Sequence, residues 1–127
     1  MLKIFFCTDV HGSEKCWRKV VSAGDFYKVD WVILGGDITG KGVIPIVRQN
    51  DDTFTSNFLG RKWILKSDRE LKDHEKLIND AGWYVYKTTQ EGLEECRGRK
   101  EKIDEIFKEK AIERVRNWVE IAEGTLK

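Results

Sequence analysis

The sequence has few cysteines and no long apolar run. Its three cysteines, Cys7, Cys16 and Cys96, are widely spaced and form no Cys-x-x-Cys pair, so neither a disulfide framework nor a zinc knuckle is expected. No apolar run approaches the roughly 18 residues of a membrane span, and the apolar stretch at the N-terminus is too short for a signal peptide. These absences predict a cytoplasmic protein with reduced thiols and no membrane partner.

An excess of charge of one sign is also missing. Lysine and arginine together number 23 against 22 aspartates and glutamates, which leaves a net charge of +1. Such a balanced surface has no electrostatic footprint for nucleic acid. Hydrophobic residues make up 40% of the 127 residues, which is enough for one packed core and indicates a single domain.

The residues that are present predict an α/β fold that begins with a βαβ unit. Apolar runs at 2–7 and 30–37 are typical of strands that are buried on both faces. The segment 13–24 between them predicts a helix that Ser13 caps and Gly24 ends. Its apolar face consists of Cys16, Trp17, Val20 and Val21. A strand, helix and strand this close in sequence predict two parallel neighbouring strands.

The rest of the chain predicts a hairpin, two more strands and further helices. We expect the hairpin at 43–49 and 53–60, strands at 61–66 and 83–87, and helices at 67–82, after Thr88 and at 101–122. Pro45 indicates an edge position for its strand. His74 lies on an apolar helical face, which predicts a partly buried structural histidine, and the five tryptophans lie on periodic apolar faces, which predicts that they are buried in the core.

Polar side chains follow both N-terminal strands. Asp9 and His11 come after the first strand and Asp37 after the second, and the carboxyl ends of adjacent parallel strands meet at one edge of a sheet. Two carboxylates and one imidazole can ligate Mn²⁺, Fe or Zn²⁺. Alternatively, Asp9 caps the next helix, and Asp37 is an ordinary turn acid. Thr39 and Lys41 lie in the glycine-rich stretch that follows and can contact a phosphate, although the spacing is not that of a P-loop.

The segments TDVHG and GGDITGK, which contain Asp9, His11 and Asp37, resemble the first two motifs of the calcineurin-like metallophosphoesterases. The resemblance implies hydrolysis of small phosphomonoesters or phosphodiesters with two divalent ions (Mn, Fe, Zn or Ni). Asp9 and His11 would hold one ion and Asp37 would bridge both. The later family motifs, Gly-Asn-His-Asp/Glu, a further His and Gly-His-x-His, have no counterpart, and the only other histidine is His74.

By this resemblance the chain supplies about half of a dinuclear site and no catalytic residue of its own, so we expect it to be inactive alone. Either residues 1–127 are the incomplete N-terminal part of a metallophosphoesterase domain, or the chain is a short relative with one metal or none. In the first case the fold is a partial, mixed β-sheet packed with helices. Its uncovered apolar surface would be buried by a C-terminal half or by homo-oligomerisation. The alternative function is a non-catalytic module that binds a phosphate ligand or a protein partner.

Overall fold

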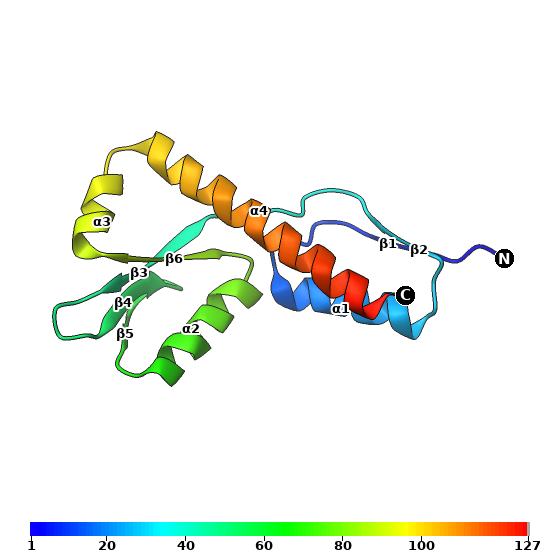
Figure 1. Ribbon diagram of the computed structural model, residues 1–127, viewed down its shortest axis with the longest axis horizontal. Coiled ribbons are helices and arrows are strands. Elements are labelled where there is room, and N and C mark those ends of the chain that lie inside the picture. Colours follow the sequence, from blue (N-terminus) through cyan, green and yellow to red (C-terminus); the bar gives the residue numbers. More distant parts are fainter. Residues whose placement is uncertain (127) are drawn as a thin grey trace.

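The computed structural model describes residues 1–126, which form an α/β fold with four helices and two β-sheets (Figure 1). In chain order the elements are β1 (Ile4–Cys7), α1 (Glu14–Phe26), β2 (Trp31–Leu34), β3 (Val43–Arg48), β4 (Phe54–Phe58), β5 (Arg61–Leu65), α2 (Asp68–Asp80), β6 (Tyr84–Thr89), α3 (Gln90–Cys96) and α4 (Lys100–Thr125). The predicted α/β class and the N-terminal βαβ unit are confirmed. None of the helices in this part of the chain is long and apolar enough to cross a membrane.

The N-terminal unit pairs β1 and β2 in parallel, with Ile4 opposite Trp31. The hydroxyl of Ser13 accepts a hydrogen bond from the amide of Cys16, which confirms Ser13 as the N-cap of α1. The helix continues past Gly24 to Phe26, and Cys16 is exposed, so these two details of the prediction are wrong. Tertiary packing of the later turns stabilises the longer helix, because Gly24 is itself buried there.

One face of the two-stranded sheet is open, contrary to the prediction that both strands are buried on both faces. Helices α1 and α4 cover only the face that carries Phe5, Cys7, Val32 and Leu34. The opposite face, called here the open face, consists of Ile4, Phe6, Trp31 and Ile33, with side chains 53%, 63%, 63% and 41% exposed. The expectation that all five tryptophans are buried is therefore wrong for Trp31, because alternation along β2 turns it away from the helices.

The second sheet has four strands in the order β5-β4-β3-β6. The antiparallel pairs β3–β4 and β4–β5 confirm the predicted hairpin and the strand that follows it, and the parallel pair β3–β6 makes this sheet mixed. Helix α2 packs on it, with Leu71 and Ile78 in the same buried cluster as Ile46 of β3. The structure thus contains two hydrophobic clusters, one for each sheet.

Pro45 lies in an interior strand, so its predicted edge position is wrong. Strand β3 runs between β4 and β6, but β4 pairs only with the segment from Ile46 to Arg48. Pro45 pairs with Tyr86 of β6 alone. The proline is tolerated because the β4 side of β3 carries no ladder at that position.

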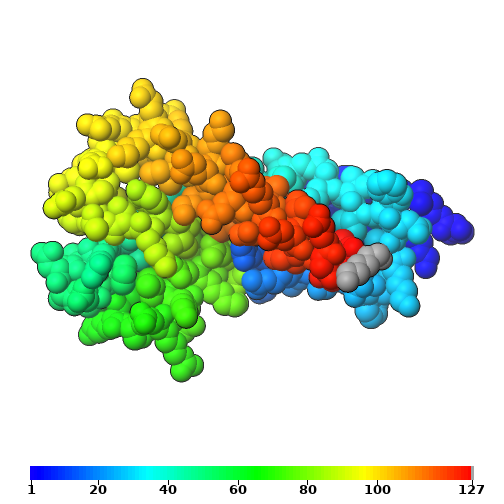
Figure 2. Space-filling view, viewed as in Figure 1, coloured from blue at the N-terminus to red at the C-terminus, as the bar shows by residue number. Residues whose placement is uncertain are grey.

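Helix α4 connects the two halves of the molecule. In Figure 1 it runs from beside β6 to α1, and it forms a continuous ridge in the space-filling view of Figure 2. Near its middle, Phe107 packs edge-on against Tyr84 of β6 at 5.2 Å between ring centroids. Further along, Trp118 stacks on Trp17 of α1 at 5.1 Å. Helix α4 therefore contacts both the N-terminal unit and the second sheet.

The burial of His74 predicts that the protein loses stability in mild acid. Its ring is buried and makes a 2.9 Å hydrogen bond with the Ser56 hydroxyl, and burial lowers its pKa below the ordinary 6.5. The unfolded chain then binds more protons than the folded one, so the free energy of unfolding falls as the pH drops through the ordinary histidine range. Urea titrations at pH 7.5 and 5.5 measure this loss. The His74→Gln variant should show less of it, and an equal loss in both proteins would contradict the prediction.

Candidate metal centre

The predicted ligands come together at the carboxyl ends of β1 and β2. One ligand atom each from Asp9, His11 and Asp37 lies within 4.8 Å of the other two, and all three residues are exposed. Val10, between the first two, is 3% exposed and belongs to the cluster around Trp17. The buried Val10 anchors the loop to the core, while its two polar neighbours remain at the surface.

Hydrogen bonds between the two loops hold these residues in register beyond the strands. The amide of Asp9 donates to the carbonyl of Gly36 at 3.1 Å, and the amide of His11 donates to the carbonyl of Asp37 at 2.8 Å. The parallel pairing of β1 with β2 thus continues into the loops. The backbones of the two loops that carry the candidate ligands are therefore tied directly to each other.

All three candidate ligands have left-handed backbone conformations. Their φ angles are 59° for Asp9, 49° for His11 and 50° for Asp37, and they account for three of the six non-glycine residues with positive φ in the described chain. This conformation costs about 1–2 kcal/mol for an L-residue. Such strain persists only where the surrounding structure enforces it, and it clusters at functional sites. Strain at three neighbouring polar residues is therefore a second, independent sign of function.

The electrostatics of the cluster favour a cation. Asp9 raises the pKa of Asp37, first because it hydrogen-bonds to the Asp37 carboxyl and second because two negative charges repel. His11 offsets a smaller part of this rise. A divalent ion between the carboxylates would remove this repulsion, and the relief would contribute favourably to the free energy of metal binding.

The donor set fits one metal ion after a small adjustment. Two atoms that bind one ion at about 2.1 Å each can lie at most about 4.2 Å apart. The 4.8 Å spread exceeds this by an amount that side-chain rotations can close, since all three residues are exposed. Oxygen, oxygen and nitrogen donors suit Mn²⁺, Fe or Zn²⁺. The predicted alternative, in which Asp9 caps the next helix, is wrong, because Ser13 is the N-cap of α1.

Thr39 and Lys41 lie on the loop that follows Asp37, and both are exposed. The backbone of this loop is anchored to the start of β6. The Gly40 amide donates to the Tyr84 hydroxyl at 2.6 Å, and the Lys41 amide donates to the Gly82 carbonyl at 2.8 Å. The loop leaves both side chains free to meet a ligand, and their contact with phosphate stays a prediction.

Two residues that contact the loop of the candidate ligands, Gly82 and Arg114, were not predicted from the sequence. Gly82, which follows α2, has a φ of +89°, and a Cβ at this position would overlap the carbonyl oxygen of His11. Arg114 of α4 donates a hydrogen bond to the carbonyl of Gly12, the residue that follows His11. The only signal for Arg114 was a charged residue within the apolar stripe of a helix, between Ala111 and Trp118.

Comparisons with models of known families, with curated proteins and with solved structures found no match for this chain.

Proposed function

We propose that the protein takes part in metal-dependent hydrolysis of phosphate esters, with Asp9, His11 and Asp37 as metal ligands. The observation that carries the proposal is the convergence of these three donors on two loops whose strained backbones are hydrogen-bonded to each other. Neither strain nor repulsion between carboxylates benefits the fold, so both are consistent with a binding role. The resemblance of the two motifs to metallophosphoesterases supports phosphate esters as the substrates.

Each residue has a distinct part in this proposal. Asp9 and His11 would hold one ion and Asp37 would share it with a second, as the resemblance to metallophosphoesterases implies. A bound divalent ion would polarise a phosphoryl oxygen and generate hydroxide at neutral pH. Thr39 and Lys41 are the residues proposed to contact the phosphate. The three free cysteines favour a reducing compartment, which we take to be the cytoplasm.

The Asp37→Asn variant tests the metal site. Asparagine tolerates the left-handed backbone but lacks the negative charge, so we expect Mn²⁺ affinity to fall by about a hundredfold or more in isothermal titration. Asp52→Asn is the matched control, because Asp52 is also an exposed aspartate with positive φ, at 63°. Equal Mn²⁺ affinity in wild type and Asp37→Asn would contradict the assignment.

The reaction is tested with the native gene product purified from its source cells. Mn²⁺ should stimulate hydrolysis of bis(4-nitrophenyl) phosphate, and Asp37→Asn should abolish the stimulated rate. Unchanged turnover in the variant would remove Asp37 from the proposed function. Strong binding of phosphate without metal, unaffected by Asp9→Ala, would instead favour a non-catalytic phosphate-binding module.

The open face favours partner binding as a second candidate function. Parallel strands are normally covered on both faces, and contiguous apolar surfaces of this kind mark interaction sites. Both outer edges of the β1–β2 pair are also without a strand among the described residues. A non-catalytic module could therefore bury Phe6 and Trp31 against another protein.

Self-association through the open face is the measurable form of this second candidate. We expect sedimentation at rising protein concentration to show a dimer, and Trp31→Glu to shift it toward monomer, because a buried unpaired charge is costly. Ile64→Glu serves as the control, since Ile64 of β5 is similarly exposed but lies on the other sheet. A wild-type monomer at high concentration would contradict the prediction.

A further inference from the structure

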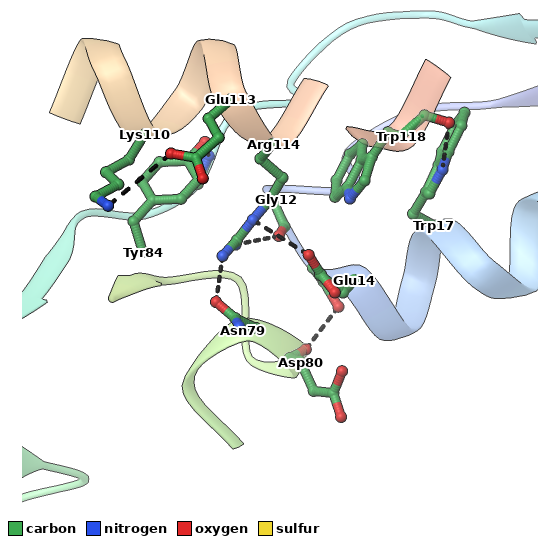
Figure 3. Close-up of polar contacts among 12 residues, drawn as sticks. Gly12, Glu14, Trp17, Asn79, Asp80, Tyr84, Lys110, Glu113, Arg114 and Trp118 are labelled. Atoms are coloured by element: carbon green, nitrogen blue, oxygen red, sulfur yellow. Dashed lines mark hydrogen bonds and ion pairs between the residues drawn. The ribbon is translucent and has the colours of Figure 1, made fainter. Parts of the chain in front are cut away.

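Arg114 lies at the junction between the candidate metal loop and the rest of the fold. Its side chain is among the few charged groups that are buried, with the residue 8% exposed. Nη1 donates to the carbonyls of Gly12 at 2.9 Å and Trp83 at 2.8 Å, and Nη2 donates to the side-chain oxygen of Asn79 (Figure 3). Nε lies 3.6 Å from a carboxylate oxygen of Glu14. One guanidinium thus connects α4 to the metal loop, α1, α2 and the start of β6.

Only an arginine can make this set of contacts. Its planar guanidinium directs several N–H groups along fixed, divergent directions, whereas a lysine ammonium is a compact charge on a flexible stem. Burial lowers the pKa of Arg114, and Glu14 offsets part of this effect. The guanidinium stays charged, because arginine is not deprotonated in proteins. Its hydrogen bonds to carbonyl groups are therefore charge-assisted and stronger than neutral ones.

The contact with Gly12 acts on the backbone of a candidate ligand. His11 and Gly12 are two consecutive residues with positive φ, at 49° and 70°. The amide of Gly12 donates to the carbonyl of Ile38 at 2.9 Å, and its carbonyl accepts from Arg114. Gly12 is therefore held on both sides, by the Asp37 loop and by α4. Since the side chain of His11 is exposed, the position of its imidazole depends on this backbone.

We propose that Arg114 is a positioning residue for the metal centre, which holds the backbone at His11 and Gly12 in the conformation that brings His11 to the two carboxylates. The inference rests on the proposed metal binding by Asp9, His11 and Asp37. Arg114 does not touch the ion. Arg114 increases metal affinity because it keeps the strained loop in its binding conformation before the ion arrives. Without Arg114, the free-energy cost of ordering the loop would be subtracted from the binding free energy.

The experiment measures Mn²⁺ affinity by isothermal titration for wild type, Arg114→Lys and Arg114→Met, at a temperature where each is folded. We expect Arg114→Met to bind Mn²⁺ about tenfold to a hundredfold more weakly. Arg114→Lys should fall between it and wild type, because an ammonium restores the charge but not all of the directed contacts. Leu65→Ala is the matched control: it removes a buried side chain from the other cluster and should leave affinity within about twofold.

A readout on the metal-free protein separates positioning from general destabilisation. Hydrogen exchange at the Gly12 amide should accelerate in the Arg114 variants and stay unchanged in Leu65→Ala. If Arg114→Met fails to fold, Mn²⁺ affinity and hydrogen exchange at Gly12 are measured in Arg114→Lys and Asn79→Ala instead. Asn79→Ala removes the side chain that accepts from Nη2 of Arg114. If the wild type binds Mn²⁺ and these variants bind it with the same affinity, the positioning role is overturned and the proposed function is not. Absence of Mn²⁺ binding by the wild type would overturn the proposed function and this inference together.

Discussion

Replacing Trp118 with alanine is expected to lower the free energy of unfolding by about 3–5 kcal/mol. Trp118 is 3% exposed and stacks on Trp17 with an interplanar angle of 8°. The indole N–H of Trp17 also donates to the Trp118 carbonyl at 3.2 Å. The pair joins α4 to α1, so the cavity left by the substitution opens where the N-terminal unit meets the rest of the protein. Urea titration followed by circular dichroism measures the loss.

Trp31→Ala is the control for this prediction. The same side chain is removed, but Trp31 lies on the open face and is 63% exposed. In the monomer its loss should change the free energy of unfolding by less than about 1 kcal/mol. An equally large loss in both variants would mean that the open face is buried in solution. A small loss in Trp118→Ala would contradict the role of the Trp17–Trp118 stack.

Replacing Gly82 with alanine is expected to lower both the stability of the fold and the metal affinity of the candidate site. A Cβ at Gly82 would overlap the His11 carbonyl oxygen, which is backbone and cannot rotate away. The left-handed φ of +89° adds about 1–2 kcal/mol of strain for alanine, and relief of the overlap adds about 1–3 kcal/mol. Because the displaced atom belongs to His11, Mn²⁺ affinity should fall as well. Thermal unfolding and isothermal titration measure the two effects.

Gly60→Ala isolates the effect of the overlap. Gly60 has a comparable φ of +73°, but a Cβ there meets no atom within 4 Å. This variant should lose about 1–2 kcal/mol from the backbone strain alone and keep its metal affinity. If the two glycine variants have the same stability and the same affinity, the close approach of Gly82 to His11 does not support the site.

Local patterns in the sequence predicted most of the elements and the location of the candidate site. Apolar runs of strand length and a Ser13 cap identified β1, α1 and β2, because these signals depend on residues a few positions apart. The same short βαβ connection implied that Asp9 and His11 lie near Asp37, since a crossover helix leaves few places for the second strand.

Errors arose where the outcome depended on what packs against an element. Pro45 indicated an edge strand because it lacks an N–H, yet it lies in an interior strand, β3, which pairs with β4 only from Ile46 onward. Trp31 belongs to a continuous apolar run, which cannot distinguish a strand covered on both faces from one covered on a single face. In both cases the deciding contacts involve residues distant in sequence.

The sequence by itself therefore determined the α/β class, the N-terminal βαβ unit and the three donors that follow its strands, because hydrophobic period and chain connectivity are local properties. The tertiary structure alone decided the division into two sheets, the open face and the contacts that Gly82 and Arg114 make with the loop of His11 and Gly12. Arg114 is 102 residues from Gly12 in the chain. A contact across that distance depends on how α4 packs against α1 through Trp118 and against β6 through Phe107, which no local pattern encodes.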